Sequence, residues 1–194
     1  MTINNVKKIS VIVALGNPGA TYKNTYHNAG YMGLHEFIKI SGEDFRLKKK
    51  SLFSWAQAHN LVVAISETNM NNSGTSVKSL LSYFKRKPNE LLVLHDDADI
   101  LLGEYKLSFG RGAAGHHGIE SIQEYIKTKE FWRLRIGIRK HRGKAESFVL
   151  SKISAADKKK LYSAIWSATK KLIENESPSG PVLTSVSGRS MSLK

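Results

Sequence analysis

The segment formed by residues 15–30 constrains this chain more than any other stretch. It follows an apolar, β-branched run over residues 9–15, which predicts a buried strand. Asn17-Pro18-Gly19 then predicts a tight turn, because proline fixes φ and glycine accepts backbone conformations that a side chain forbids. His27 stands where helical periodicity begins, and open α/β sheets present reactive groups at such junctions. By itself the segment is equally compatible with an ordinary strand-to-helix connection. The functional interpretation therefore depends on which other residues are expected to lie near His27.

The rest of the chain alternates strands with helices, which favours an α/β fold over an all-β fold or a helix bundle. Residues 52–58 and 61–65 predict a hairpin, so we expect a mixed, mostly parallel, twisted sheet flanked by helices. Further strands are expected at residues 91–94, 105–109 and 133–138. Helices are expected at residues 27–41, in the segment that ends at residue 87, and at residues 119–126 and 154–174.

The length of 194 residues suits one core of ordinary size, so we expect a single domain over residues 1–176. Residues 177–194 are rich in Ser, Gly and Pro without a period, which predicts a loosely ordered tail. No internal repeat or linker in the sequence divides the chain further.

The composition favours a cytoplasmic protein. The chain has no cysteine, so neither disulfides nor thiol chemistry is available. Its longest apolar run is too short to span a bilayer. Two lysines precede that run, as in a secretory signal, but Gly-Asn-Pro-Gly follows it instead of a cleavage site of small residues. We therefore expect no association with a membrane.

The charge points to a polyanionic partner. Thirty Lys and Arg residues against 16 Asp and Glu residues give a formal net charge of +14, which concentrates polyanions around the chain. The cations cluster in residues 46–50, 85–87 and 127–144. This pattern favours nucleic acid as the partner, with solubility or non-specific adhesion as the alternative interpretation.

Four polar clusters follow directly on predicted strands: Asn17, Asn69-Met70-Asn71, His95-Asp96-Asp97 and His116-His117. Because neighbouring parallel strands end at the same edge of a sheet, these clusters can meet beside His27. Together they supply an imidazole base, a carboxylate to orient it and carboxamides that can donate to a developing oxyanion. These groups suit hydrolysis by an activated water molecule.

Competing chemistries fit less well. No Gly-x-Ser-x-Gly motif marks a serine hydrolase, and the zinc-protease pattern that His35-Glu36 begins has Lys39 at its fifth position. Residues 110–115 match the glycine fingerprint of dinucleotide-binding domains, but the acidic residue expected about 20 positions later is missing. A loop whose backbone amides and Arg111 approach a phosphate fits better than a nicotinamide site. We also expect no metal, because the spacing of the possible ligands matches no known site. These ligands are His95, Asp96, Asp99, His116 and His117.

Taken together, several stretches resemble bacterial peptidyl-tRNA hydrolases. They occur in the order of that family and cover residues 9–150. Five motifs in register make the resemblance specific. The motifs are Leu15-Gly16-Asn17-Pro18-Gly19 with Tyr22 and His27-Asn28-Ala29-Gly30, Met70-Asn71 with Ser73-Gly74, His95-Asp96 with Asp99, residues 110–118, and Arg133-Leu134-Arg135-Ile136-Gly137-Ile138.

The resemblance implies hydrolysis of the ester that joins a stalled peptide to tRNA, by a monomeric α/β domain without a cofactor. It implies that His27 is the base and Asp96 its orienting partner. The expected partner is peptidyl-tRNA, bound through its acceptor stem and its peptide. The residues expected to bind the substrate are Asn17, Tyr22, Met70, Asn71 and His117. The residues expected to bind tRNA are Lys106, Arg111, Arg135, Arg139, Lys140 and Arg142.

This sequence departs from the family at several positions. Where the family usually has His-Asn-Gly, the chain has His116-His117-Gly118, so a substrate-contacting amide has become an imidazole. Thr25-Tyr26-His27 replaces the usual Thr-Arg-His, and Ser108 replaces a second lysine of the family. An imidazole at position 117 is larger than an amide and titrates near neutral pH, so we expect a different pH dependence. A non-catalytic RNA-binding relative with the same fold is the alternative hypothesis.

Overall fold

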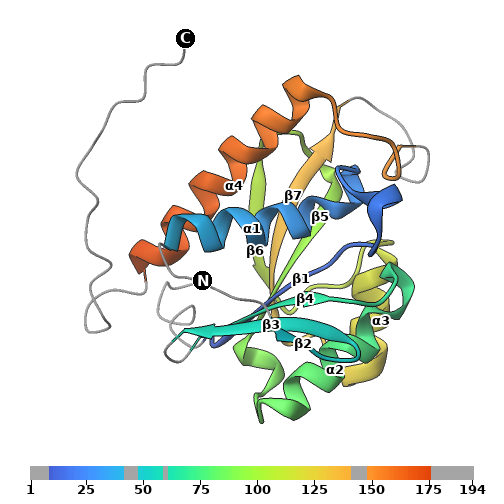
Figure 1. Cartoon of the computed structure of the whole chain (residues 1–194), viewed down its shortest axis with the longest axis vertical. Helices are drawn as coiled ribbons and strands as arrows, with labels where there is room; N and C mark the ends of the chain where they lie inside the picture. Colours follow the sequence, from blue (N-terminus) through green and yellow to red (C-terminus); the bar gives the residue numbers. More distant parts are fainter. Residues whose placement is uncertain (1–8, 42–47, 59–60, 141–147, 176–194) are drawn as a thin grey trace.

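The computed structural model describes residues 9–41, 48–58, 61–140 and 148–175. They form a seven-stranded sheet between two layers of helices (Figure 1). The expected tail, residues 177–194, lies outside the described residues. The strands are β1 (Val11–Ala14), β2 (Lys48–Lys49), β3 (Phe53–Ala58), β4 (Leu61–Ser66), β5 (Leu91–Leu101), β6 (Tyr105–Phe109) and β7 (Trp132–Arg139). The helices are α1 (Ala29–Ser41), α2 (Ser73–Tyr83), α3 (His117–Ile126) and α4 (Ala155–Asn175), with short 3₁₀ helices η2 (Ala20–Tyr22), η3 (Tyr26–Asn28), η4 (Met70–Asn72) and η5 (Pro88–Glu90).

The sheet is parallel at its centre and antiparallel at both edges. Its strand order is β2-β3-β4-β1-β5-β7-β6, and β4, β1, β5 and β7 run parallel. The edge strands β2 and β3 on one side, and β6 on the other, pair antiparallel. Strand β1 is buried along its whole length, which explains why it is apolar throughout rather than alternating. The expected α/β class, mixed sheet and hairpin are confirmed, with parallel pairing in the central strands.

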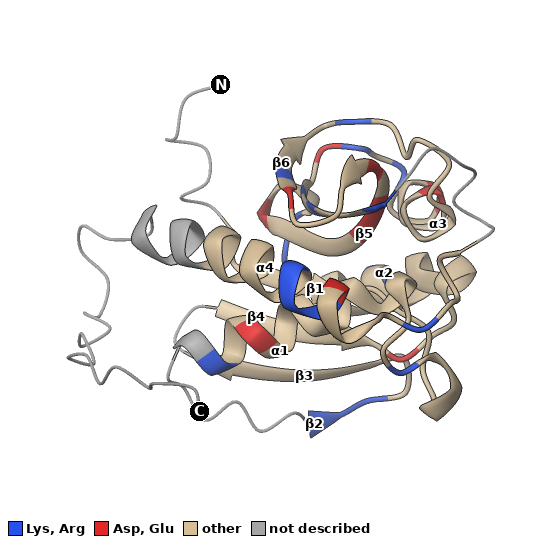
Figure 2. Cartoon of the chain, turned by 90° about the horizontal axis from the view of Figure 1, so that it is seen from above, with Lys and Arg blue, Asp and Glu red and all other residues tan. Residues whose placement is uncertain are grey.

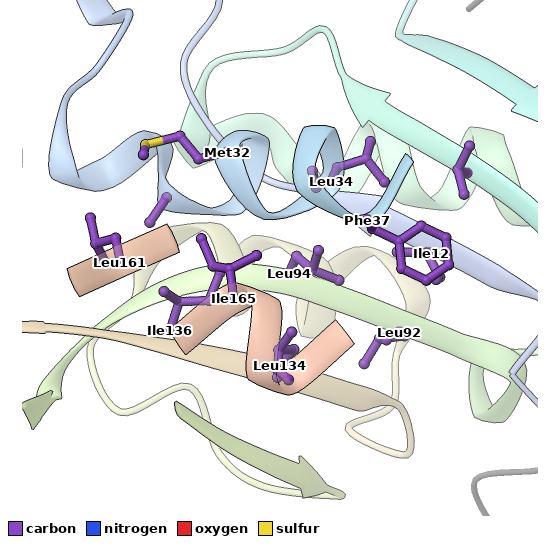
Figure 3. Packing of buried hydrophobic residues seen from close by; sticks show 14 of the residues in the cluster. Ile12, Met32, Leu34, Phe37, Leu92, Leu94, Leu134, Ile136, Leu161 and Ile165 are labelled. Carbon is purple, nitrogen blue, oxygen red and sulfur yellow. The ribbon is translucent and has the colours of Figure 1, made fainter. Parts of the chain in front are cut away.

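Two apolar clusters lie on opposite faces of the sheet. Helices α1 and α4 cover one face (Figures 1 and 3), and α2 and α3 cover the other. Neighbouring residues of β1 point to different clusters, because side chains alternate along a strand. Ile12 belongs to the first cluster together with Leu34 and Ile165, whereas Val13 belongs to the second together with Leu80. The loop after β1 therefore leaves from the middle of the sheet, between the two layers.

The ends of several elements differ from the sequence-based expectations. Strand β5 was expected over residues 91–94 with a polar loop after it, but it continues to Leu101. The cluster His95-Asp96-Asp97 therefore lies inside a buried strand, because β7 continues to pair with it. The expectation of a loop at this point is wrong. Helix α2 ends at Tyr83 rather than at residue 87.

The helix expected from residue 27 begins as η3 and becomes α1 at Ala29. The expected cap of the last helix is confirmed, since the backbone N–H of Asp157 donates to Oγ of Ser154 at 3.1 Å. None of the described helices is long and apolar enough to cross a bilayer.

Helix α1 packs directly on the end of β1 and on the inner part of β5. A Cβ built on Gly30 would overlap the carbonyl oxygens of Leu15 and Leu94. Only glycine permits this approach at the start of α1, and it brings η3, with His27, next to β5.

Replacing Gly30 by Ala should destabilise the fold by about 1–3 kcal/mol or more, because the added methyl group meets backbone rather than a movable side chain. Urea unfolding measures this loss. The matched control is Gly112→Ala, since nothing lies within 4 Å of a Cβ built at that glycine. Equal unfolding midpoints for the two variants would contradict the close packing of α1.

Candidate active site

The predicted base and its carboxylate lie side by side. Nδ1 of His27, in η3, is 2.9 and 3.0 Å from the two carboxylate oxygens of Asp96, in β5. Because an ionised carboxylate only accepts hydrogen bonds, this geometry assigns the proton to Nδ1, which donates it to Asp96. Nε2 of His27 then bears the lone pair, which is the form of imidazole that accepts a proton.

A second imidazole, that of His116, binds the same carboxylate. Its Nε2 lies 3.1 Å from Oδ1 of Asp96, and its Nδ1 accepts the backbone N–H of Ile119 at 3.3 Å. His116 thereby caps α3, and acceptance at Nδ1 assigns its proton to Nε2. The rings of His116 and His27 lie 5.3 Å apart. The sequence placed His116 in the right cluster but gave it no role, because histidine is not among the residues that usually cap a helix.

A third imidazole, that of His95, lies behind the other two and is fully buried. Its Nδ1 donates to the backbone carbonyl of Asp96 at 2.6 Å, and its ring packs at 4.6 Å from that of His116. Burial lowers the pKa of His95 well below its ordinary value, so the ring stays neutral. Its Nε2 finds no partner within the described part of the chain.

The cluster shifts the pKa values of Asp96 and His27 in opposite directions. Burial raises the pKa of Asp96, but the electrostatic attraction and hydrogen bonds of His116 and His27 lower it by more. The net pKa is therefore well below the ordinary value, and this carboxyl stays ionised. Burial lowers the pKa of His27, but the hydrogen bond and charge of Asp96 raise it to a net value above the ordinary 6.5. His27 is therefore neutral, and able to act as a base, above this raised pKa.

Asn17 is fixed at the end of β1 with one amide hydrogen-bond donor unused. Its Oδ1 accepts the backbone N–H of Met70 at 2.8 Å. Its own backbone N–H and carbonyl bind the carboxamide of Asn28, at 2.8 and 3.0 Å. Nδ2 of Asn17 has no acceptor among the described residues and can donate to a ligand.

Met70 lies against the beginning of α3. It is buried, and a Cβ built on Gly118 would overlap its Sδ. The expected placement of Met70 beside the other site residues agrees with its contact to Asn17.

Three predicted substrate-binding residues are less tightly held. Asn71 follows Met70 in η4 and is exposed, and Tyr22 is half-buried in η2. His117 begins α3, where its side chain is 64% exposed and its Nδ1 lies 3.0 Å from Oε2 of Glu120. His116, not His117, therefore contacts the carboxylate of Asp96. The roles assigned to Asn71, Tyr22 and His117 stay predictions.

Two of the cations expected to bind tRNA are already paired with carboxylates. Nε of Arg135 lies 2.6 Å from Oδ2 of Asp97. Nζ of Lys140 lies 2.8 Å from Oδ2 of Asp157. Pairing reduces the charge that these side chains offer to a phosphate, although both remain partly exposed.

The other predicted cations are less constrained. Lys106 lies on the edge strand β6, and Arg111 lies in the loop before α3; both are exposed. Arg139 is half-buried at the end of β7, and its Nε has no partner among the described residues. Arg142 lies outside the described residues. Lys106 and Arg111 are thus the clearest phosphate ligands that the structure offers from the predicted set.

The beginning of α4 and the segment before it hold the loop that carries His27. The backbone N–H of His27 donates to the carbonyl of Val149 at 2.8 Å. The hydroxyl of Tyr26 donates to Oδ2 of Asp157 at 2.6 Å. Hydrogen bonds from Lys140 and Tyr26 lower the pKa of Asp157 to about 2. The sequence gives no local sign of this clamp between Tyr26 and Asp157, because the two residues lie far apart in the chain.

His27, Asp96 and His116 also place one possible metal-ligand atom each within 4.8 Å of one another. The two hydrogen bonds to Asp96 account for the same arrangement. The expectation that the site works without a metal or other cofactor stays a prediction.

The fold and the site define an enzyme of the hydrolase class. An imidazole with a free Nε2 and an orienting carboxylate can take a proton from water, and a neighbouring carboxamide can donate to the oxygen that becomes charged. Asn17 follows the carboxyl end of β1, Asp96 lies in the neighbouring central strand β5, and His27 lies in η3 beside it.

The comparisons with known proteins agree on one family. The family model described as "Peptidyl-tRNA hydrolase" matches residues 11–180. The peptidyl-tRNA hydrolase of Francisella tularensis subsp. novicida is 38% identical over 164 residues, which cover 81% of this chain and 86% of that protein. The peptidyl-tRNA hydrolase of Aquifex aeolicus is 36% identical over 176 residues, or 85% of this chain and 88% of that protein.

A solved structure shows the same fold. The crystal structure of peptidyl-tRNA hydrolase from Acinetobacter baumannii superposes with a TM-score of 0.80 at 31% identity, over 88% of this chain and 89% of that chain. This chain belongs to the peptidyl-tRNA hydrolase family, and the resemblance stated from its motifs is confirmed.

Replacing Asp96 by Asn should lower the pKa of His27 below 6.5, because the carboxamide keeps the site buried but removes the charge that raises this pKa. Titration of the His27 ring by NMR measures the shift, and the parent protein should titrate above 6.5. An unchanged titration of His27 would contradict the coupling to Asp96.

Proposed function

We propose that this chain cleaves the ester between peptide and tRNA with a water molecule that His27 activates. The observation that carries the proposal is the hydrogen bond from Nδ1 of His27 to Asp96, which leaves Nε2 free to accept a proton. Membership of the peptidyl-tRNA hydrolase family supports the substrate class.

The reaction begins when Nε2 of His27 takes a proton from the water and the oxygen attacks the ester carbonyl carbon. Asp96 stabilises the imidazolium that forms. When the tetrahedral intermediate collapses, the carbon–oxygen bond to the ribose breaks, and the imidazolium returns the proton to the ribose oxygen. The products are a tRNA with a free 3′ end and a peptide carboxylic acid, which releases its proton to solvent and becomes a carboxylate.

The unused Nδ2 donor of Asn17 supports a role in holding the acyl part of the substrate. It can donate to a peptide carbonyl or to the oxyanion of the intermediate. A peptide group next to the ester gives this donor a partner that a free aminoacyl ester lacks. In this proposal the exposed side chains of Asn71 and His117 add contacts to the substrate, and the buried Met70 holds Asn17 through its backbone N–H.

Exposed cations beside the site support binding of the acceptor stem. Lys106 and Arg111 contact phosphates in this proposal, and these contacts position the RNA without reading its sequence. Arg135, which is paired with Asp97, adds a weaker contribution to the binding of phosphate. One chain supplies every group that the proposed reaction needs, which is consistent with a monomer. A tRNA substrate is consistent with a cytoplasmic protein.

Replacing His27 by Ala should lower turnover of an N-blocked aminoacyl-tRNA by about two to four orders of magnitude, because the general base is lost. Binding of uncharged tRNA should stay within about twofold, since phosphate contacts supply most of the affinity. His35→Ala is the matched control, because this histidine is exposed on α1.

Turnover by the His27→Ala variant near the parent rate would remove His27 from the role of base. Binding without any turnover by the parent protein would instead favour the alternative, a non-catalytic RNA-binding relative.

The kcat/KM of the parent protein should rise with pH through the raised pKa of His27, because only the neutral imidazole accepts a proton. The midpoint of this rise should lie above 6.5, and Asp96→Asn should move it lower while reducing the plateau. His117→Asn should leave the midpoint unchanged, since His117 does not contact Asp96. A midpoint that follows the His117 substitution would assign the pH dependence to that residue instead.

A further inference from the structure

Two of the basic runs in the sequence take no part in the candidate site. Residues 48–50 are all lysine, and residues 85–87 read Lys-Arg-Lys. The fold brings the two runs together at the β2 edge of the sheet, where Figure 2 shows β2 in blue along its length. We call the surface formed by Lys48, Lys49, Lys50, Lys85, Arg86 and Lys87 the β2 basic edge.

Aromatic rings join the two runs. Nζ of Lys50 lies 4.0 Å from the ring centre of Tyr83, at the end of α2, and Nζ of Lys48 lies 5.2 Å from that of Trp55, in β3. The rings of Trp55 and Phe84 are 4.8 Å apart in an edge-to-face contact. These contacts fix the position of the lysine run relative to the residues that follow α2.

The charges of the β2 basic edge are largely free. All five lysines are exposed. Among the described residues, the carboxylate that pairs with this surface is that of Glu90, 3.6 Å from Nη1 of Arg86. Five exposed lysine charges, none of them paired with a carboxylate of a described residue, favour the binding of a polyanion.

Tyr83 adds an exposed ring among these charges. The side chain of Tyr83 is 48% exposed. Surfaces that bind single-stranded nucleic acid combine two components. Cations contact the phosphates along the nucleic-acid backbone, and an aromatic ring stacks on a base.

Lysines on an edge strand also prevent another strand from adding to the sheet. This reason accounts for Lys48 and Lys49 of β2. It does not account for residues 85–87, which follow a helix, or for the exposed ring of Tyr83.

The β2 basic edge lies far from the cations of the candidate site. Strands β2 and β6 are opposite edges of the seven-stranded sheet, six strand spacings or about 29 Å apart. Lys106 of β6 and the β2 basic edge therefore face different partners or different segments of one partner.

We propose that the β2 basic edge binds single-stranded RNA, at the same time as an acceptor stem occupies the other edge of the sheet. The surface gives the protein a second RNA contact that does not touch the ester. Binding depends on lysine–phosphate contacts at residues 48–50 and 85–87 and on stacking of a base on Tyr83. The inference does not require the chain to be a hydrolase, since it concerns RNA without an ester.

The test measures binding of a labelled single-stranded RNA of about 12 nucleotides to the full chain by fluorescence anisotropy, as a function of salt. The double variant Lys50→Gln and Lys85→Gln should weaken binding about tenfold and reduce the slope of log K against log salt by about 1.4. The matched control is Lys159→Gln with Lys160→Gln, which removes the same charge from exposed positions on α4 and should change the affinity less than about twofold.

A third variant separates stacking from charge. Tyr83→Ala should weaken binding while leaving the salt slope unchanged, because it removes a ring and no cation. Equal losses in the β2 variants and the α4 control would reduce the effect to net charge and overturn the proposal. Binding of anionic lipid vesicles in preference to RNA would overturn it too.

Simultaneous binding is tested by adding a saturating acceptor-stem minihelix to the complex with the single strand. The label should remain bound, and complete displacement would overturn the proposal of a second contact. Hydrolysis of N-blocked aminoacyl-tRNA by the Lys50→Gln and Lys85→Gln variant should keep its kcat within about twofold, since these residues lie outside the reacting site. A failure of the second contact is therefore distinguishable from a failure of the proposed reaction.

Discussion

The carboxylate of Asp96 is the group on which the site depends. It is buried in a central strand, where an unpaired charge would be strongly destabilising, and two imidazole N–H groups satisfy it. The same two hydrogen bonds impose different tautomers on His27 and His116, because His116 also caps α3 through Nδ1. One imidazole is left with Nε2 open for chemistry, and the other ties the glycine-rich loop to the sheet. The single charge of Asp96 thereby orients the base, His27, and fixes the loop that carries His116 beside it.

The remainder of the fold keeps His27 against this carboxylate. Gly30 lets α1 approach β1 and β5 closely, and the carbonyl of Val149 receives the backbone N–H of His27. The clamp of Tyr26 and Asp157 ties the adjacent residue to α4. Strand β5 and residues 149–157, both distant from η3 in sequence, thus hold this short 3₁₀ helix, so a rigid scaffold supports the reactive side chain. The cations outside this assembly remain available for RNA.

Much of the fold could be predicted from the sequence, because apolar runs and turn residues act locally. The apolar β1 and the Ser154 cap are such signals. Contacts between distant residues could not be predicted by the same reasoning. The length of β5 depends on pairing with β7, and the bond of His116 to Asp96 depends on the path of the loop before α3. His95-Asp96-Asp97 were expected in a loop but lie inside β5, because the local sequence does not show that polar residues in a strand have buried partners.

The protonation pattern of the three clustered histidines tests this account most directly. Long-range ¹H–¹⁵N correlation spectra of the imidazole rings, recorded at about pH 8, where an ordinary histidine is neutral, report which nitrogen of each ring carries the proton. The account predicts a proton on Nδ1 of His27 and of His95, and on Nε2 of His116. A neutral His27 protonated on Nε2 would contradict it, because the lone pair would then face Asp96 and no base would face the substrate.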